Sequence, residues 1–564
     1  MAIRPYRSYQ HQLFTFALCP LPLHFAYMLL TDELLLHYRR CSRRAFLDIY
    51  GEEGQKSPEK DFLFKLKAEK EFHHQQIISH YGLNPHQPRN MLKTQEEEVD
   101  KEKLIVLTKQ LMSQGVESIY KGVVAWNLID GEAGKITLTA TPTVLIKQNI
   151  PSELGNWSYY PLNIHLGKNV KPEYKLLMAF TIDILNQIQG INLTRGEMAL
   201  RDNRKPHKIN LKVWFSRTQE LINECFQMLA GENIPDVYIS RQKCSFCPWY
   251  EGCYQKAKSD QHLSLIPGMT PKRIEYLKQI GVNNMTTLSQ TSIADLTFVF
   301  TKGIADRLLQ QSISLISHQA ILKQPNLLPI PNSDIELYFD IEADGNLQGS
   351  TQGNNLSNSM WCDRTLDYLL GILLIDKKNN QQKYYSFLAK TPEEEKIIWH
   401  QFLEFINQYP NAPIFHYSEY EVETIKRLAH LYQTSSIQLK TLLSRLFDLH
   451  KILINSFYLP VENYSLKTVA NWLGFRWRDP KIGKLSSNGG NVGGDQCVFW
   501  YDQWLKTGDS TWLEYIVIYN EDDCQGTYEL KKWMEKYNNF EEKKLQQNIN
   551  NCEVLSNSNS KYPI

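Results

Sequence analysis

The apolar run "LYFDIEADG", residues 337–345, constrains the fold of this chain more than any other stretch. Its hydrophobic and aromatic residues predict a central β-strand, in which side chains two residues apart project to the same face. Asp340 and Glu342 would therefore lie side by side. Two carboxylates so close repel each other unless a cation lies between them or one of them keeps its proton. The run predicts a strand that carries part of a cation site.

Length and composition bound the class of protein. A chain of 564 residues with 42% hydrophobic and 12% aromatic residues is too long for one core, and we expect about three or four folded domains. The 62 basic and 61 acidic residues cancel, so the net charge of +1 neither indicates nor excludes nucleic-acid binding. Pro20, Pro22 and His24 interrupt the apolar stretch at residues 13–30, which predicts that it does not span a membrane. We expect a cytoplasmic protein with no membrane partner.

Further acidic residues follow the predicted strand. Glu421 lies in "HYSEYEVET" and Asp448 in "LFDLHKIL", while Tyr519 and Asp523 in "YNEDD" are one helical turn apart and would share a helix face. The order of these motifs resembles the DEDD exonucleases of the ribonuclease H-like fold, particularly the YprB-like branch. In that branch the first strand carries D-x-E, a second motif ends in an aromatic residue followed by an acid, and the third reads Y-x-x-x-D.

The resemblance implies a role for each of these residues. Asp340, Glu342, Glu421 and Asp523 would hold two Mg²⁺ or Mn²⁺ ions about 4 Å apart, because hard cations prefer oxygen ligands and two ions can clamp the attacking and leaving oxygens. Tyr519 would orient the attacking water, and Asp448 would support the ligands from behind. Glu421 departs from the family, where most relatives carry aspartate. The competing interpretation of an isolated D-x-E is an ordinary solvated strand face. Glu521 and Asp522 are predicted to be helix N-terminal acids.

A cysteine motif marks the middle of the chain. "CSFCPWYEGC" contributes Cys244, Cys247 and Cys253, and both zinc sites and iron–sulfur clusters use such a C-x-x-C pair together with a fourth ligand. "LLLHYRRCSRRAFLDIYG" resembles the opening motif of RecB-like nucleases, which implies that Cys41 joins the other three around a 4Fe–4S cluster. Zinc with the same ligands remains open. The resemblance also makes Met28 the expected start, with residues 1–27 as a leader.

The same resemblance points to a nuclease centre that has lost its ligands. Where PD-(D/E)xK nucleases have an aspartate this chain has Thr143, and where they have an acid and a lysine it has Asn163 and His165. A neutral threonine or asparagine cannot supply the negative charge that Mg²⁺ prefers. We therefore predict an inactive centre. The alternative is a live centre that uses Glu153 or Asp183, although neither has a lysine two residues on.

The segment "LIPGMTPKRIEYLKQIGV" resembles a helix–hairpin–helix unit. Gly268 can make a tight turn that presents backbone N–H groups to a phosphate, and Lys272 and Arg273 follow it on the next helix. Such contacts hold the phosphate backbone without reading its sequence. A plain helical hairpin that joins two domains is the alternative.

Together these motifs predict a multidomain α/β chain. The expected parts are a leader (1–27), a degenerate PD-(D/E)xK-like α/β domain with iron–sulfur cysteines (28–260), a helix–hairpin–helix connector (261–331), an RNase H-like α/β/α domain with a mixed sheet (332–540) and a disordered tail (541–564). The predicted function is metal-dependent hydrolysis of nucleic acid, DNA rather than RNA, by a 3′–5′ exonuclease that acts on single strands, with a helicase or repair protein as a partner. The alternative is a non-catalytic iron–sulfur subunit that binds nucleic acid in a repair or defence complex.

Overall fold

The fold is described from a computed structural model, which defines residues 27–92, 100–131, 134–201, 205–231, 234–323, 328–345, 365–481, 484–485 and 493–558. Residues 1–26 of the predicted leader lie outside the described residues. No helix among the described residues is long and apolar enough to cross a membrane.

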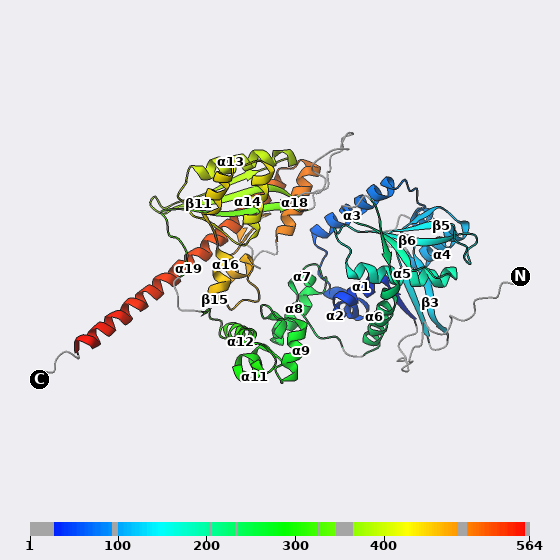
Figure 1. The fold of residues 1–564 in the computed structure, drawn as a ribbon, viewed down its shortest axis with the longest axis horizontal. Helices are drawn as coiled ribbons and strands as arrows, with labels where there is room; N and C mark the ends of the chain where they lie inside the picture. The colour runs from blue at the N-terminus through cyan, green and yellow to red at the C-terminus, as the bar shows by residue number, and fades with distance from the viewer. Residues whose placement is uncertain are drawn as a thin grey trace. The chain divides into compact units, whose positions relative to one another are not determined.

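The chain divides into two compact units (Figure 1). The first unit contains Leu66–Val237 and Arg241–Glu251 together with the described residues up to Pro58. The second contains Gly252–Ile564 and two short segments, Glu59–Lys65 and Tyr238–Ser240. The division at residue 251 falls close to the expected boundary at 260, and the helices expected in a separate connector belong to the second unit.

The first unit is a mixed α/β structure with two sheets. Its strands are β1 (Tyr27–Thr31), β2 (Ser118–Tyr120), β3 (Val124–Gly131), β4 (Gly134–Ala140), β5 (Val144–Gln148), β6 (Ser158–Ile164), β7 (Arg195–Ala199) and β8 (His207–Asn210). Its helices are α1 (Asp32–Arg40), α2 (Ser42–Tyr50), most of α3 (Asp61–His80), α4 (Lys101–Gln114), α5 (Pro172–Gln189), α6 (Lys212–Ala230), α7 (Arg241–Cys244) and the short η1 (Glu53–Gln55) and η2 (Pro88–Met91). The sheet orders are β1-β4-β3 and β2-β5-β6-β7-β8.

Helix α5 organises the first unit because apolar residues surround most of it. Phe180, Ile184 and Leu185 pack into a core with strands β1, β3 and β4, and Met178 and Ile182 pack into a second core with Met198 of β7 and its neighbours. Such continuous burial is what a helix between two sheets requires. The helix begins with Pro172 and ends at Gly190, whose left-handed φ of 62° a glycine adopts without steric cost.

The second unit begins within α8 (Tyr250–Ser259), continues through a group of short helices and ends in an α/β domain. Its first elements are η3 (Leu263–Leu265), α9 (Pro271–Gln279), α10 (Met285–Gln290), α11 (Ile293–Thr297), α12 (Lys302–Ser317) and β9 (Ile321–Leu322). The domain contains β10 (Ile335–Asp344), β11 (Leu366–Asp376), β12 (Gln381–Leu388), η4 (Pro392–Glu394), α13 (Glu395–Asn407), β13 (Ile414–His416), α14 (Tyr420–Leu431), α15 (Ser436–Leu443), β14 (Leu446–Asp448), α16 (Leu449–Ser456), β15 (Phe457–Tyr458), α17 (Leu466–Trp472), β16 (Arg478–Asp479), β17 (Lys484–Leu485), α18 (Gly494–Thr507) and α19 (Thr511–Ser558).

The central sheet of this domain has the order β12-β11-β10-β13-β14. Strand β10 lies in the middle, antiparallel to β11 and parallel to β13, so the sheet is mixed as expected. The alternation of β10 sends Leu337, Phe339 and Ile341 to one face, where they pack with α13, α14 and α18. Tyr338 points to the other face and packs with α16, α17 and the later turns of α19. The sheet therefore lies between two helical layers.

Helix α19 differs from the expectation for the C-terminus. It continues to Ser558, through most of the residues for which the polar composition predicts a disordered tail. The tail lacks proline until Pro563, and its first residues, "EEKKLQQ" at 541–547, are mostly glutamate, lysine and glutamine, which are good helix formers. Composition identified the segment as polar, but the helix propensity of its residues favours continuation of α19.

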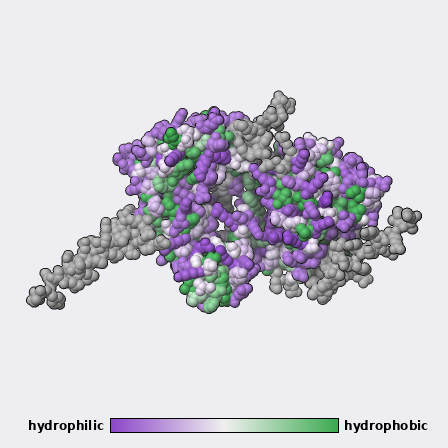
Figure 2. Space-filling view, viewed as in Figure 1, coloured by the Kyte–Doolittle hydropathy of each residue, from purple (hydrophilic) through white to green (hydrophobic). Residues whose placement is uncertain are grey.

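The surface is predominantly hydrophilic, with hydrophobic residues scattered over it (Figure 2). A more concentrated apolar area lies over α11, where Ile293 is 39% and Phe298 is 84% exposed.

Candidate metal centre

Strand β10 places the two acids of the opening motif on one face of the central sheet. Asp340 pairs with Gly371 of β11, and Glu342 pairs with Leu369 two positions along. Glu342 is buried, while Asp340 is partly accessible. A β-bulge follows Glu342 and ends the regular register. The strand thus carries both carboxylates toward its C-terminal end, where a local irregularity makes room around them.

Helix α19 supplies the third acid from a distant part of the sequence. Oxygen atoms of Asp340, Glu342 and Asp523 all lie within 4.8 Å of one another, and these three residues are the group of potential metal ligands that the described residues form. Tyr519 lies one turn before Asp523 and hydrogen-bonds to its carboxylate. The spacing of four residues in the sequence therefore does place both side chains on the same face of a helix.

Burial and mutual repulsion both disfavour the ionised form of the three acids. Burial raises the pKa of Asp340 and Glu342 well above the usual range, and the charge of Asp523 raises both further. Burial also raises the pKa of Asp523 to about 7, although hydrogen bonds from Trp477 and Tyr519 and the charge of nearby Lys467 oppose the shift. Carboxylates held this close keep their charge at low cost only when a cation neutralises them.

Glu421, the second residue of α14, lies near the same group of acids. Its charge contributes to the raised pKa of Asp340, so it lies within electrostatic reach of the site. Its own carboxylate accepts a hydrogen bond from Ser418 at 3.1 Å and lies 3.5 Å from Nδ1 of His416. Glu421 is outside the group of three whose oxygens lie within 4.8 Å. Its longer side chain is held by these neighbours, at the rim of the site.

Asn520 is a site residue that sequence reasoning missed. Its Nδ2 donates to Asp340 at 2.7 Å, and its Oδ1 accepts from the hydroxyl of Tyr384 at 2.8 Å. The side chain passes over Gly371, where a Cβ would lie 1.7 Å from Oδ1 of Asn520. Gly371 therefore keeps the strand opposite Asp340 open for this amide. The only sequence signal was a glycine inside an apolar strand, which often marks close approach of another group.

Trp477 and Cys497 also contact the ligands without having been predicted. The indole Nε1 of Trp477 donates to Asp523 at 2.8 Å, and its ring is almost fully buried. Lys467 lies with its Nζ 5.6 Å from the centroid of the Trp477 ring. The buried thiol of Cys497 hydrogen-bonds to Glu342. These groups come from α17, α18 and the segment between them, which no local pattern connects to β10.

Other predicted acids have structural partners. Asp448 ends β14 and accepts a hydrogen bond from the backbone N–H of Lys451 at 3.1 Å, so it caps α16. Glu521 and Asp522 were expected at a helix N-terminus, and this expectation is wrong because α19 begins ten residues earlier at Thr511. Both acids instead bind Arg478, at 2.7 Å and 2.8 Å.

None of the four cysteines of the predicted cluster forms a disulfide bond in the described part of the chain. Cys41 caps α2, and its Sγ accepts from the N–H of Arg44 at 3.4 Å. Burial raises the pKa of Cys247 to about 11, and the nearby Cys244 and Cys41 raise it further. Three of the four thiols therefore lie near one another in the first unit, and Cys253 follows on α8. They do not form a group of ligands within 4.8 Å among the described residues.

Two of the three residues of the predicted former centre, Thr143 and Asn163, are hydrogen-bonded, whereas Nε2 of His165 is buried without a hydrogen-bond partner among the described residues. The N–H of Thr143 donates to Asn163 Oδ1 at 3.3 Å, and the Thr143 hydroxyl accepts from the N–H of Ile164 at 3.1 Å. His165 stacks on Tyr174 with ring centroids 3.8 Å apart. Burial lowers the pKa of His165 to about 3, so the ring is neutral at pH 7. Among the residues that the structure describes, no group of potential metal ligands forms at these positions.

The predicted hairpin turn is present as a local structure. Gly268 has a φ of 78°, and the N-cap residue Thr270 starts α9 two residues later. Arg273 donates back to the carbonyl oxygen of Gly268, which ties the turn to the helix. Nζ of Lys272 lies 5.7 Å from the centroid of the Tyr276 ring. Gly268 therefore lies in a turn before α9, and the helix–hairpin–helix unit stays a prediction.

Comparison with known protein families assigns the part of the chain that carries the acidic site to a superfamily. Residues 337–535, from β10 into α19, match the model of the RNase H superfamily. The second unit therefore contains an RNase H-like domain, and the three clustered acids belong to two of its elements. No curated protein matches the chain. An RNase H-like domain implies a nucleic-acid substrate and a nuclease-type activity, and its nucleases use divalent metal ions. The carboxylate cluster can bind such an ion.

Proposed function

We propose that the RNase H-like domain is a DEDD-type exonuclease that hydrolyses phosphodiester bonds with two Mg²⁺ or Mn²⁺ ions. The observation that carries this proposal is the convergence of Asp340, Glu342 and Asp523 within 4.8 Å from two distant segments. Buried acids with raised pKa values that share one small volume are costly, and they are characteristic of functional sites. Four oxygen-bearing side chains, with Glu421 as the fourth, fit the ligand preference of both ions.

Each of these residues would have its own role in the proposed hydrolysis. Asp340, Glu342 and Asp523 would hold the ions, with Glu421 as a ligand at the rim. Bound ions would activate the attacking water and stabilise the leaving oxygen. The hydroxyl of Tyr519, which is already hydrogen-bonded to Asp523, would orient that water. Asn520 and Trp477 would hold the carboxylates in position. Each of these contacts is made before any ligand arrives, so the site is preorganised.

The preference for single-stranded ends is supported by an aromatic residue beside the acids. Tyr420 precedes Glu421 and is 45% exposed, and the charge of Glu342 contributes to the raised pKa of its hydroxyl, so the ring lies near the site. An exposed aromatic ring can stack on an unpaired base but not on one within a duplex. We propose a single-stranded DNA substrate that is degraded from its 3′ end.

The test is degradation of end-labelled single-stranded DNA and RNA in Mn²⁺ by the full chain and by the double variant Asp340→Asn/Asp523→Asn. The proposal predicts that label at the 5′ end appears in a ladder of shortened products, label at the 3′ end in mononucleotides, and that the double variant makes neither. Undiminished degradation by the double variant would refute the site. A reversed pattern of labels would refute the polarity alone.

We further propose that residues 28–260 form a degenerate RecB-like nuclease domain whose cysteines bind a 4Fe–4S cluster, with zinc as the alternative metal. The proximity of Cys41, Cys244 and Cys247 supports this, as do the N–H groups of Arg44 and Trp249 that donate to two of their sulfurs. Cys253 remains the predicted fourth ligand. Anaerobic purification followed by iron, sulfide and zinc analysis of the full chain and of Cys247→Ala distinguishes the metals, and an equal content in both proteins would contradict the assignment.

If the double nuclease variant and the natural chain bind single strands equally and neither degrades them, the second candidate function holds. The protein would then be a non-catalytic subunit that binds nucleic acid.

A further inference from the structure

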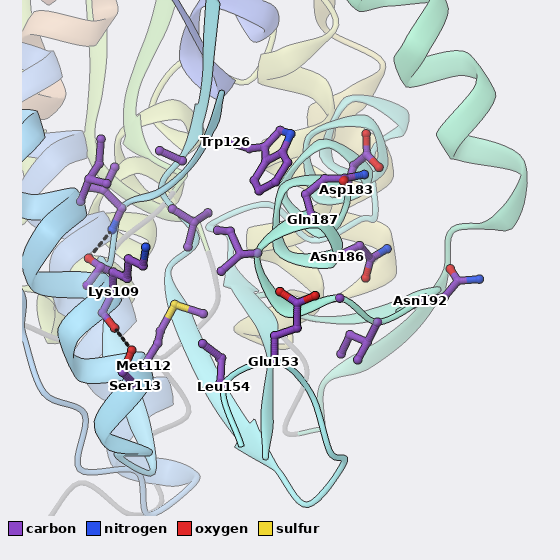
Figure 3. Close-up of a pocket in the computed structure, with 18 residues that line it drawn as sticks. Lys109, Met112, Ser113, Trp126, Glu153, Leu154, Asp183, Asn186, Gln187 and Asn192 are labelled. Carbon is purple, nitrogen blue, oxygen red and sulfur yellow. Dashed lines mark hydrogen bonds between the residues drawn. The ribbon is translucent and has the colours of Figure 1, made fainter. Parts of the chain in front are cut away.

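The first unit contains a cavity of about 1270 Å³ that the proposed nuclease function does not use (Figure 3). It is lined by residues of α4, of β3, of the segment after β5 and of the C-terminal end of α5. Apolar side chains, Met112, Val124, Leu154 and Ile188, form part of its wall. Binding pockets for drug-sized ligands measure about 300–1000 Å³, so this cavity has room for such a ligand and a polar extension.

The cavity also carries polar side chains that have no partner in the described structure. Asp183 and Gln187 lie one turn apart on α5, and Lys109 and Glu153 line the same space (Figure 3). None of these four side chains makes a hydrogen bond or ion pair with the residues described. Asn186 differs, because it donates to and accepts from the backbone of Leu193 at 3.1 Å and 2.8 Å and so holds the adjacent loop.

Of these groups, Asp183 destabilises the folded state most. It is half-buried between Ile182 and Ile184, which are almost fully buried. Burial raises its pKa to about 6, and no other charge contributes to the shift. A carboxylate removed from water without a hydrogen-bond donor destabilises the folded state. A ligand that supplies N–H donors to this carboxylate would recover that free energy.

Trp126 adds a flat surface to the same cavity. Its ring lies on β3, which packs against α5, and it is 36% exposed (Figure 3). Tyr159 and Phe180, in the core of the same unit, are by contrast fully buried. An accessible indole, a carboxylate and an amide around one cavity are the groups that bind a planar heteroaromatic ring by stacking and by hydrogen bonds to its edge.

We propose that this cavity binds a guanine base, with Trp126 stacked on its plane and Asp183 on its edge. Guanine presents two adjacent donors, N1–H and the N2 amino group, and a carboxylate accepts both in a bidentate pair. The amide of Gln187 can donate to O6. Uracil and thymine offer one N–H between two acceptors, and cytosine offers only its amino group, so neither matches an ionised carboxylate as well.

The ammonium group of Lys109, which also lines the cavity, would pair with the phosphate of the same nucleotide. The guanine could come from a free nucleotide or from a strand, and both would present the base and a phosphate. The cavity is separate from the acids of the RNase H-like domain, so the proposal does not depend on nuclease activity.

Calorimetric titration of the full chain with GMP, AMP, CMP and UMP at pH 7.5 tests the proposal. GMP is expected to bind at least tenfold more tightly than the other three. Asp183→Asn is expected to weaken GMP at least tenfold and to improve binding of xanthosine monophosphate, whose C2 carbonyl accepts from the new amide where guanine donated. A gain of affinity for xanthine cannot come from misfolding, so it distinguishes a direct contact from a structural role.

Two controls complete the test. Asp340→Asn, in the other unit, should bind GMP as the natural chain does, and Trp126→Ala should lose GMP affinity without gaining xanthine binding. Titration with a short oligonucleotide that contains one guanine, against the same sequence with adenine, separates a strand from a free nucleotide as the source. Equal affinity for all four mononucleotides, or tighter binding of AMP by a protonated Asp183 at pH 5, would overturn the assignment.

Discussion

Each of the two units contains a site at which family resemblance suggests metal chemistry. The side chains of the two sites differ in charge and in their hydrogen bonds. In the first unit Thr143 and Asn163 bond to each other, and His165 is stacked and neutral. In the second, Asp340, Glu342 and Asp523 face one another, and burial raises the pKa of each. Neutral side chains such as Thr143 and Asn163 can bond to each other without an ion, whereas three buried carboxylates need a cation to keep their charges.

This contrast predicts the largest effect from equivalent substitutions in the two sites. Asp340→Asn should lower kcat/KM for single-stranded DNA on the order of a thousand-fold, because a lost metal ligand removes several kcal/mol of charge stabilisation. Thr143→Ala in the first unit should change it less than twofold. Initial rates on a labelled oligonucleotide measure both. Comparable losses in the two variants would show that the contrast is false.

Tyr519→Phe should have the next largest effect. Loss of the hydroxyl that hydrogen-bonds to Asp523 should lower kcat about 10- to 100-fold, the usual contribution of a group that orients the nucleophile, with little change in KM. A rise in KM at constant kcat would instead assign Tyr519 to substrate binding. His165→Phe in the first unit, which keeps the stacking on Tyr174, is the matched control and should leave both constants unchanged.

The pH dependence of metal binding sharpens the comparison. Because the folded-state pKa of Asp523 is raised to about 7, the metal-free folded protein binds a proton that the unfolded chain releases near pH 4. Folded-state stability without metal therefore falls as pH rises between about 4 and 7. Mn²⁺ competes with that proton and with the protons favoured on Asp340 and Glu342, whose pKa values burial also raises, so its affinity should rise by about tenfold per unit or more over this range. Titration calorimetry at pH 5.5, 6.5 and 7.5 measures this, and a flat profile would contradict it.

The smallest effect concerns stability without metal. Asp523→Asn removes one of three mutually repelling carboxylates, and we expect it to raise the metal-free Tm by about 2–4 °C, the shift that about 1 kcal/mol gives in a domain of this size. Mn²⁺ should stabilise the natural chain but not the variant. Asn163→Ala, which removes a satisfied hydrogen bond, should lower the Tm instead. Calorimetric unfolding with and without Mn²⁺ compares the three proteins, and a lower Tm for Asp523→Asn would show that its hydrogen bonds outweigh the repulsion.

Local patterns predicted a good part of the second unit. The alternation in residues 337–345 predicted β10 and the shared face of Asp340 and Glu342, and the spacing of Tyr519 and Asp523 predicted their shared helix face. Both patterns arise within a few residues of the chain, so they can be recognised without the fold. The helix that carries Glu521 and Asp522 was also foreseen, but its beginning was not, because no local signal placed it at Thr511.

The sequence by itself determined which residues carry charge and which of them share a face of one strand or helix. Only the tertiary structure decided that β10 and α19 meet, that Asn520 crosses Gly371 to reach Asp340, and that Trp477 holds Asp523. It also decided that Asp183 lines a cavity with Trp126. The physical reason is that backbone periodicity acts over a few residues, whereas convergence depends on the packing of elements whose separation in the chain leaves no periodic trace.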